Sequence, residues 1–238
     1  MLGGCDTLVL KCGDKLAALA DRAGDFEDWI TAAMGRAAGR VSVVAGHRGA
    51  PLPAPGTVGR VVVTGSAAML TDHAGWSEAC ARWLREAVDA GLPVLGICFG
   101  HQLLAHALGG TVGDNPHGLE VGSVALDRQV AGDPLLGSLP ARFSANMSHR
   151  QAVLQLPPGA LQLASSARDP HAAFVCSPRA WGVQFHPEFD GAVTAAHIEH
   201  YRAQGLLGDA EARDLQAACR DTPASRGVLA RFAQLERW

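Results

Sequence analysis

Residues 96–102, with the sequence GICFGHQ, constrain the fold of this chain more than any other segment. They follow an apolar run at 92–95 and precede a helix-forming run at 103–108. A strand, a Gly-x-Cys-x-Gly turn and a helix form the thiol version of a nucleophile elbow, in which the central residue adopts a strained conformation. Gly96 and Gly100 leave room for such a turn because they carry no side chain. The pattern predicts an α/β sheet with Cys98 at the carboxyl end of a strand.

Strand and helix patterns alternate through the first 108 residues. Short apolar runs predict buried strands at 7–10, 41–44 and 61–64. Apolar residues at helical spacing predict helices over 26–38 and 75–90. Strands that alternate with helices form parallel βαβ units, so we expect a doubly wound, mostly parallel sheet.

The pattern changes after residue 110. Short alternating segments at 120–125, 160–164 and 173–176 are separated by turn residues, which predicts a small antiparallel patch beside the parallel sheet. The run 180–185 predicts a further strand, and the chain is helical from 192 onward, with a break at Gly205 and Gly208. No linker-like or repeated segment divides the sequence, so we expect one domain over residues 1–238.

Charge and composition argue against several classes of protein. The chain has 20 Lys and Arg against 23 Asp and Glu, a net charge of −3, and no basic run, which argues against binding to nucleic acid or to an anionic membrane. No apolar run reaches the length of a transmembrane helix, and the first residues lack the basic and apolar regions of a signal peptide. The expected location is the cytoplasm.

The six cysteines include no C-x-x-C pair, so we expect neither a zinc site nor a disulfide framework. Only Cys98 has a local reason to be reactive. The N–H groups at the start of the following helix, including that of Phe99, favour a thiolate and later an oxyanion. Cys5 is expected on a loose terminus, and four others are expected to be inert structural thiols: Cys12, Cys80, Cys176 and Cys219.

A second segment provides what a catalytic thiol needs, namely a base and a group that orients it. His186 follows the predicted strand 180–185, Pro187 turns the chain, and Glu188 is within reach of the imidazole. Taken alone, this tripeptide is also typical of a loop histidine beside a solvated glutamate, and the elbow alone is also typical of a structural turn with a buried cysteine. Together the two segments favour a triad of Cys98, His186 and Glu188.

These two segments, GICFGHQ at 96–102 and GVQFHPE at 182–188, resemble the signature segments of the class I glutamine amidotransferases. The likeness extends from the first predicted strand to the last. It implies a flavodoxin-like fold and a Cys-His-Glu amidohydrolase, for which we expect no cofactor and no metal. Residues 109–113 and 115–122 resemble the GMP-synthase-like branch of the family, which includes stand-alone γ-glutamyl peptidases.

The resemblance implies a thioester mechanism. Cys98 would attack the amide carbon of glutamine or of another γ-glutamyl compound. His186 would protonate the leaving ammonia or amine and then activate water, while Glu188 orients the imidazole. The oxyanion would lie between the N–H of Phe99 and one from the loop of Gly65 and Ser66, with Ser66 the expected donor.

The resemblance also implies a set of substrate contacts. Gln102 is one helical turn after Cys98 and matches the family position that contacts the substrate amino acid; an ordinary polar residue on an exposed face is the alternative. Residues 146–149 resemble the family's Ser-His segment, which acts largely through its main chain. The expected substrate-binding residues are therefore Gln102, Ser148, His149 and Arg150.

The sequence departs from the family at two places. Gly65-Ser66-Ala67 stands where Gly-Gly-Pro or Gly-Ser-Pro is usual, and Arg150 with Gln151 replaces the Gly-Asp pair of true GMP synthases. The chain contains neither an ATP-pyrophosphatase domain nor a Gly-rich phosphate loop, so we do not expect it to make GMP alone.

Three functions remain open at this point. The first is a glutaminase that passes ammonia to a separate synthetase subunit, and the second is a stand-alone γ-glutamyl peptidase. The third is a non-catalytic thiol-sensing or binding protein. The presence of His186 and Glu188 beside Cys98 argues against the third, since a sensor needs only the thiol.

The remaining histidines are expected to take no part in the chemistry. His101 and His106 are interpreted as structural or surface residues, and the ring of His149 as not catalytic. His197 and His200 form an i, i+3 pair that is more often solvated than bound to metal. Four further histidines stand alone and show no metal-ligand spacing: His47, His73, His117 and His171.

Overall fold

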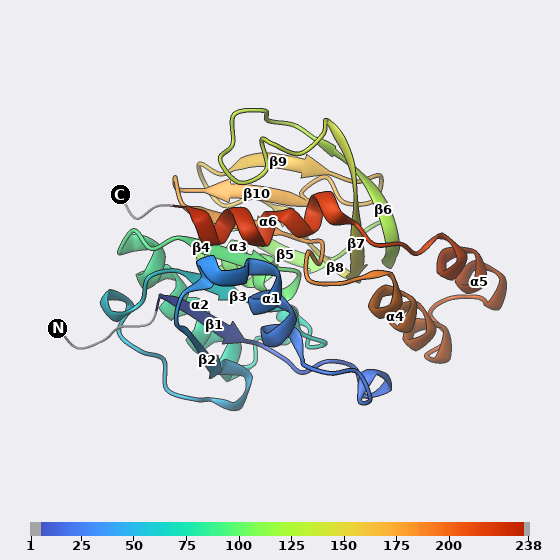
Figure 1. Ribbon diagram of the computed structural model, residues 1–238, viewed down its shortest axis with the longest axis horizontal. Coiled ribbons are helices and arrows are strands. Elements are labelled where there is room, and N and C mark those ends of the chain that lie inside the picture. The colour runs from blue at the N-terminus through green and yellow to red at the C-terminus, as the bar shows by residue number, and fades with distance from the viewer. Residues whose placement is uncertain (1–5, 236–238) are drawn as a thin grey trace.

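A nine-stranded sheet forms the centre of the molecule (Figure 1). The computed structural model describes residues 6–235, and within them the strands at one side of the sheet pair in parallel. These strands lie in the order β2 (Val41–Ala45), β1 (Thr7–Lys11), β3 (Val61–Val63), β4 (Val94–Ile97) and β11 (Ala180–Val183). With β11 as the fifth strand, this is the strand order of flavodoxin-like doubly wound folds. The predicted fold class is confirmed.

The antiparallel strands continue the same sheet beyond β11. They follow in the order β10 (Ala173–Cys176), β9 (Leu161–Ser165), β6 (Glu120–Arg128) and β7 (Arg142–His149). A separate two-stranded antiparallel sheet contains β5 (Thr111–Asp114) and β8 (Gln151–Gln155). The antiparallel patch expected from the sequence is thus present, although β5, β7 and β8 were not predicted.

Helices cover both faces of the sheet, with one pair on each: α1 (Phe26–Met34) with α6 (Pro223–Gln234), and α2 (Gly75–Asp89) with α3 (Phe99–Ala107). Figure 1 shows α1 and α6 on the viewer's side. Strand side chains alternate between the two faces, so that Val62 packs in the core under α1 and α6 while Val61 and Val63 pack under α2 and α3. Burial on both faces explains why the parallel strands are continuous apolar runs in the sequence.

The chain after β11 is helical, as predicted. Helix α4 (Gly191–Ala203) begins at Asp190, whose side chain accepts a hydrogen bond from the N–H of Val193. Both α4 and α5 (Asp209–Ala218) pack against β6 at one end of the sheet (Figure 1). The predicted break at Gly205 and Gly208 separates these two helices, and Gly205 adopts a left-handed φ of 72°.

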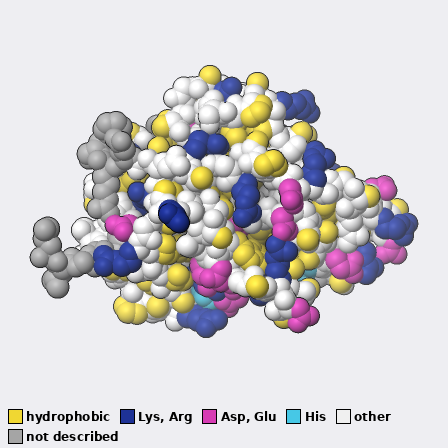
Figure 2. Space-filling view, viewed as in Figure 1, with side chains coloured by type: hydrophobic (Ala, Val, Ile, Leu, Met, Phe, Trp, Pro, Cys, Tyr) yellow, Lys and Arg dark blue, Asp and Glu magenta, His cyan; other side chains and the backbone are white. Residues whose placement is uncertain are grey.

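Charged side chains of both signs are interspersed over the face that Figure 2 shows. Within residues 6–235, no helix combines the length and the apolar character needed to cross a bilayer. The cytoplasmic location and the single domain over residues 1–238 stay predictions. Cys5 lies outside the described residues.

Candidate active site

Cys98 lies at the turn between β4 and α3, with a φ of 51° and a ψ of −104°. A positive φ is rare for a residue with a side chain and costs on the order of 1–3 kcal/mol. Backbone hydrogen bonds hold the turn on both sides, because the Cys98 N–H donates to the Val183 carbonyl of β11 and the Gln102 N–H donates to the Cys98 carbonyl. The strand, turn and helix predicted around Cys98 are therefore present, and the thiol lies at the carboxyl edge of the sheet.

Gly96 and Gly100 allow the backbones around the turn to pack closely. A Cβ atom at Gly96 would lie 2.3 Å from the carbonyl oxygen of Gly100 in α3. A Cβ atom at Gly100 would lie 2.5 Å from the carbonyl oxygen of Val63 in β3. Both separations are far below van der Waals contact, so a side chain at either position would push α3 away from the sheet.

His186 and Glu188 lie next to the thiol, on the segment that follows β11. The backbone N–H of His186 donates to the carbonyl of Asn146 in β7, at 2.8 Å. Its Nδ1 lies 2.8 Å from Glu188 Oε1, and the two side chains are 3% and 0% exposed. The imidazole stacks on the ring of Phe189, with a centroid separation of 3.9 Å and an angle of 10° between the planes. The ring is thus held at one nitrogen and on one face.

The charge of His186 results from opposing effects. Burial of the ring lowers its pKa, because it disfavours the charged form. The carboxylate of Glu188, the sulfur of Cys98 and the hydrogen bonds to both groups act in the opposite direction, and the pKa is raised to about 10. His186 is therefore an imidazolium at neutral pH, beside the sulfur of Cys98.

Gly65 brings the loop after β3 into contact with the same ring. A Cβ atom at this position would lie 2.9 Å from His186 Cε1 and 3.8 Å from Cys98 Cβ. Any residue with a side chain would displace the imidazole or the loop. At Gly65 the loop therefore approaches the ring and Cys98 with backbone alone.

A cavity of about 300 Å³ opens over Cys98. This volume is within the usual size range of small-molecule sites. Of the residues predicted for the site, Glu188 and Gly65 do not line this cavity: Glu188 pairs with Nδ1 of His186, and Gly65 is in contact with the ring. The other predicted residues all line it: Cys98, His186, Ser66, Phe99, Gln102, Ser148, His149 and Arg150.

Gln102 and His149 use their polar atoms for contacts within the protein. Gln102 Nε2 donates to the carbonyl of Gln151 at 2.8 Å and to Gln184 Oε1 at 3.1 Å. The ring of His149 lies with Nδ1 2.9 Å from the Gln151 carbonyl and Nε2 3.0 Å from Glu120 Oε2. Both side chains are buried. Their hydrogen bonds hold the cavity wall in place, and these polar atoms are not free to bind a substrate.

Ser148 lies next to the thiol through its main chain, whereas Arg150 lines the cavity with an exposed side chain. The carbonyl oxygen of Ser148 lies 3.6 Å from Cys98 Sγ. Arg150 is exposed, and its Nη2 lies 3.5 Å from the sulfur of Met69. The guanidinium is therefore an exposed positive charge beside the cavity.

One wall of the cavity comes from α4 and was not predicted from the sequence. Ser148 Oγ lies 2.8 Å from His197 Nδ1 and 3.3 Å from Tyr201 Oη. The lining residues recur at helical spacing, which is the signal that could have identified this face. They are His197, His200, Tyr201 and Gln204.

The expectation that His197 is solvated is wrong, because only 8% of this residue is exposed. Burial lowers its pKa to about 3, the neighbouring His186 and His200 act in the same direction, and the ring is therefore neutral. Its Nε2 has no hydrogen-bond partner among the described residues. His197 therefore adds a neutral ring with an unused nitrogen to the wall of the cavity.

The expectation that His73 stands alone is also wrong. Its Nδ1 lies 3.0 Å from Glu78 Oε1, and His106 Nε2 lies 3.1 Å from the same oxygen. None of these three residues lines the cavity.

The other described cysteines differ from Cys98 in their environment. Three are buried and one is partly buried, and burial raises the pKa of each thiol, in agreement with the expected inert role. These residues are Cys12, Cys80, Cys176 and Cys219.

Comparison with known proteins gives a family match over most of the chain. The family "Glutamine amidotransferase class-I" matches residues 52–201. A GMP synthase [glutamine-hydrolyzing] of Thermomicrobium roseum is 48% identical over 101 residues, which are 42% of this chain and 19% of that protein. The enzyme of the same name from Syntrophomonas wolfei is 34% identical over 158 residues, 65% of this chain and 30% of that protein. The match thus spans less than a third of the length of these relatives.

A solved structure has the same architecture. The glutamine amido transferase of Methylobacillus flagellatus superposes with a TM-score of 0.69 at 25% sequence identity. The superposition covers 98% of this chain and 92% of that one.

Proposed function

This chain belongs to the class I glutamine amidotransferase family, and on that basis we propose that it hydrolyses the γ-amide of glutamine through a thioester on Cys98. The observation that carries the proposal is the convergence of Cys98, His186 and Glu188 at one edge of the sheet, with a cavity over the thiol. Nucleophile, base and orienting group are the three parts that acyl transfer by cysteine needs.

Acylation begins with the thiolate of Cys98, which the adjacent imidazolium of His186 stabilises. The sulfur attacks the amide carbon, a C–S bond forms, and the electron pair of the carbonyl moves to its oxygen. The N–H groups of Phe99, at the start of α3, and of Ser66 are the proposed donors to that oxyanion. Each such donor stabilises a transition state by about 3 kcal/mol.

His186 acts first as a proton donor, when ammonia is released, and then as a proton acceptor, in deacylation. Because Glu188 interacts with Nδ1 of His186, Nε2 is left for the reacting groups. His186 donates its proton to the leaving nitrogen as the C–N bond breaks. It then takes a proton from water, whose oxygen attacks the thioester and releases glutamate and the thiolate.

The cavity wall supports an amino acid as the acyl donor. Arg150 offers a positive charge at the mouth, where the α-carboxylate of glutamine would meet it. Tyr201 and the unpartnered Nε2 of His197 add polar groups from α4. A volume of about 300 Å³ suits a single amino acid better than a long peptide.

The relatives support a separate acceptor for the ammonia. The two GMP synthases that we compare are glutamine-hydrolysing by name, and the chain matches only 19% and 30% of their lengths. We therefore propose that ammonia released here reaches a synthetase domain or subunit.

A stand-alone γ-glutamyl peptidase is the second candidate, and the contacts of Gln151 favour it. Its Oε1 accepts a hydrogen bond from the N–H of Leu70 at 3.0 Å, and its Nε2 donates to Thr71 Oγ1 at 2.7 Å. These bonds fix the loop that borders the cavity without any partner protein. A loop that is already in place would allow hydrolysis by the isolated chain.

Selective labelling of Cys98 tests the proposal. We expect iodoacetamide and the diazo-ketone analogue of glutamine to label Cys98 at least about tenfold faster than any other cysteine, because a helix N-terminus and an imidazolium favour its thiolate. Glutamine should protect Cys98, and Cys98→Ser should lose ammonia release by at least about a thousandfold while it keeps the far-UV CD spectrum.

The outcomes of this labelling separate the two candidates. Protection by a γ-glutamyl dipeptide but not by glutamine would favour the peptidase. Equal, slow labelling of all cysteines would contradict both candidates.

A further inference from the structure

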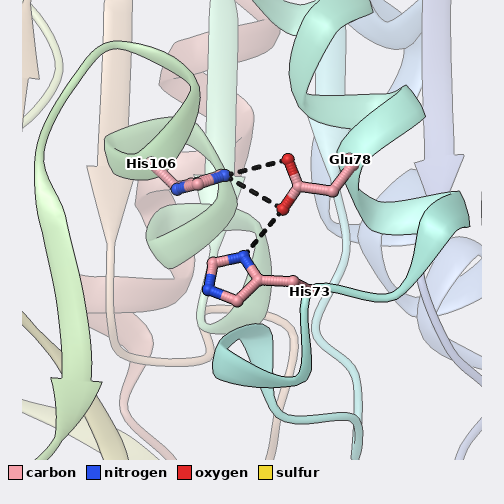
Figure 3. A group of neighbouring side chains, drawn as sticks. All are labelled: His73, Glu78 and His106. Carbon is pink, nitrogen blue, oxygen red and sulfur yellow. Dashed lines mark hydrogen bonds and ion pairs between the residues drawn. The ribbon is translucent and has the colours of Figure 1, made fainter.

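Three side chains from separate elements converge away from the cavity (Figure 3). His73 follows the turn Leu70–Asp72, Glu78 lies in the first half of α2, and His106 lies near the end of α3. One ligand atom from each residue lies within 4.8 Å of the others. Glu78 Oε1 contacts both rings, at 3.0 Å from His73 Nδ1 and 3.1 Å from His106 Nε2.

The chemistry of this cluster fits a transition-metal ion. Two imidazoles and a carboxylate are a common ligand set for Zn²⁺, with a water molecule as the fourth ligand. Bonds of about 2.0–2.1 Å in a tetrahedral site place ligand atoms roughly 3.3 Å apart. The nitrogen-to-oxygen separations of 3.0 and 3.1 Å are already close to this spacing. A metal ion could therefore replace the protons shared with Glu78 after small side-chain movements.

The site is accessible to solvent, and a hydrogen bond holds the backbone at His73. The side chains of His73, Glu78 and His106 are 62%, 32% and 29% exposed, so an ion and its water ligand can reach the cluster from solvent. His73 adopts a left-handed φ of 47°, and its N–H donates to the Leu70 carbonyl at 3.0 Å. This bond fixes the position from which the imidazole of His73 extends.

We propose that His73, Glu78 and His106 bind one Zn²⁺ or a similar divalent transition-metal ion. The ion connects the loop after β3 with α3. Residues 66–69 of this loop line the cavity, and α3 carries Cys98 at its start. A metal ion bound by both His73 and His106 therefore restrains both walls of the cavity. The importance of this restraint rests on the proposed function, whereas metal binding itself does not.

Titration of the full-length chain with Co²⁺, followed by competition between Zn²⁺ and a chromophoric chelator, tests the site. We expect one equivalent of metal with visible d–d absorption that indicates nitrogen and oxygen ligands. His73→Asn and His106→Gln should each weaken binding at least about tenfold. Asn at position 73 tolerates the left-handed backbone, so this variant remains folded even if His106→Gln does not.

Two controls make the outcome decisive. His117→Gln removes an exposed histidine elsewhere, and Cys98→Ser removes the thiol of the cavity, so both should bind metal as the wild type does. Binding that survives in both His73→Asn and His106→Gln, or that is lost in Cys98→Ser, would overturn the site. This result is independent of whether the chain hydrolyses glutamine.

Amide hydrogen exchange tests the restraint on the loop. Zn²⁺ should slow exchange at residues 66–73 in the wild type and leave it unchanged in His106→Gln. Equal exchange with and without Zn²⁺ in a wild-type protein that binds the ion would overturn the restraint and leave only the binding site.

Discussion

The imidazolium form of His186 depends on two neighbouring residues. Burial of the ring lowers its pKa, whereas the carboxylate of Glu188 at 2.8 Å and the sulfur of Cys98 raise it to about 10. The ring is 3% exposed, so water screens these charges little. His186 therefore keeps its proton well above the pH at which a solvated histidine loses it.

Replacement of Glu188 by Gln should move the basic limb of the pH dependence of kcat/KM to lower pH. The proton that His186 gives to ammonia is retained up to about pH 10 in the wild type. Without the carboxylate, the main group that raises the pKa is lost, while burial still lowers it. Initial rates of glutamine hydrolysis from about pH 6 to 11 would measure the shift.

The exposed carboxylate of Glu199 provides the matched control for this profile. Glu199→Gln should leave the basic limb in place, because this side chain pairs with Arg202 on the surface. Glu188→Gln should also lose less activity than His186→Ala, since it removes the orienting group and keeps the base. An unchanged basic limb in Glu188→Gln would show that Glu188 does not set the pKa of His186.

At the level of structural elements, the site is formed by segments that follow β3, β4 and β11. These are neighbouring strands of the parallel part of the sheet, and their carboxyl ends meet at one edge. The loop after β3 contributes Gly65, the turn after β4 contributes Cys98, and the segment after β11 contributes His186. The geometry of the site therefore depends on how closely these three segments approach one another.

Gly65→Ala should reduce kcat by about a hundredfold while the protein stays folded. The new methyl group would lie 2.9 Å from His186 Cε1 and would displace the imidazole or the loop. Gly56→Ala is the matched control, because a methyl group there meets nothing within 4 Å. Steady-state kinetics and melting temperatures of both variants would measure the effect. Wild-type kcat in Gly65→Ala would contradict the close approach of this loop to the ring.

The sequence predicts those strands, helices and turns that are marked by a pattern of neighbouring residues. The parallel strands are apolar runs, and the turn at Cys98 is marked by two glycines. The α4 wall of the cavity was missed because its buried face includes polar residues, Thr194 and His197, so the helical spacing of its residues does not form an apolar stripe. The convergence of His73 and His106 on Glu78 was missed because it depends on the packing of α2 and of the turn Leu70–Asp72 against α3, which no local pattern reports.

At the scale of the whole molecule, the sheet separates two hydrophobic cores. One lies under α1 and α6, and the other lies under α2 and α3. Helix α6 covers the first core, with Val228, Leu229 and Phe232 fully buried. The ring of Phe232 packs edge-on against Trp181 of β11, at a centroid separation of 6.3 Å. The last helix thus stabilises the strand that precedes His186.

Phe232→Ala should lower the free energy of unfolding by about 3–5 kcal/mol, because it leaves a cavity between α6 and the sheet. Leu206→Ala is the matched control, since Leu206 is 43% exposed, and its effect should stay below about 0.5 kcal/mol. Urea unfolding followed by tryptophan fluorescence would measure both values. Equal stability of the two variants would show that α6 contributes little to the fold.

The position of β11 between β4 and β10 has a consequence for synthesis of the chain. Cys98 leaves the ribosome long before His186, and until β11 arrives β4 has an open edge that can pair with another nascent chain. The backbone bond from Cys98 to Val183 cannot form before then either. A translating ribosome therefore carries the nucleophile without its base, and the proposed reaction becomes available only when β11 and the segment with His186 and Glu188 have emerged and the strand has inserted.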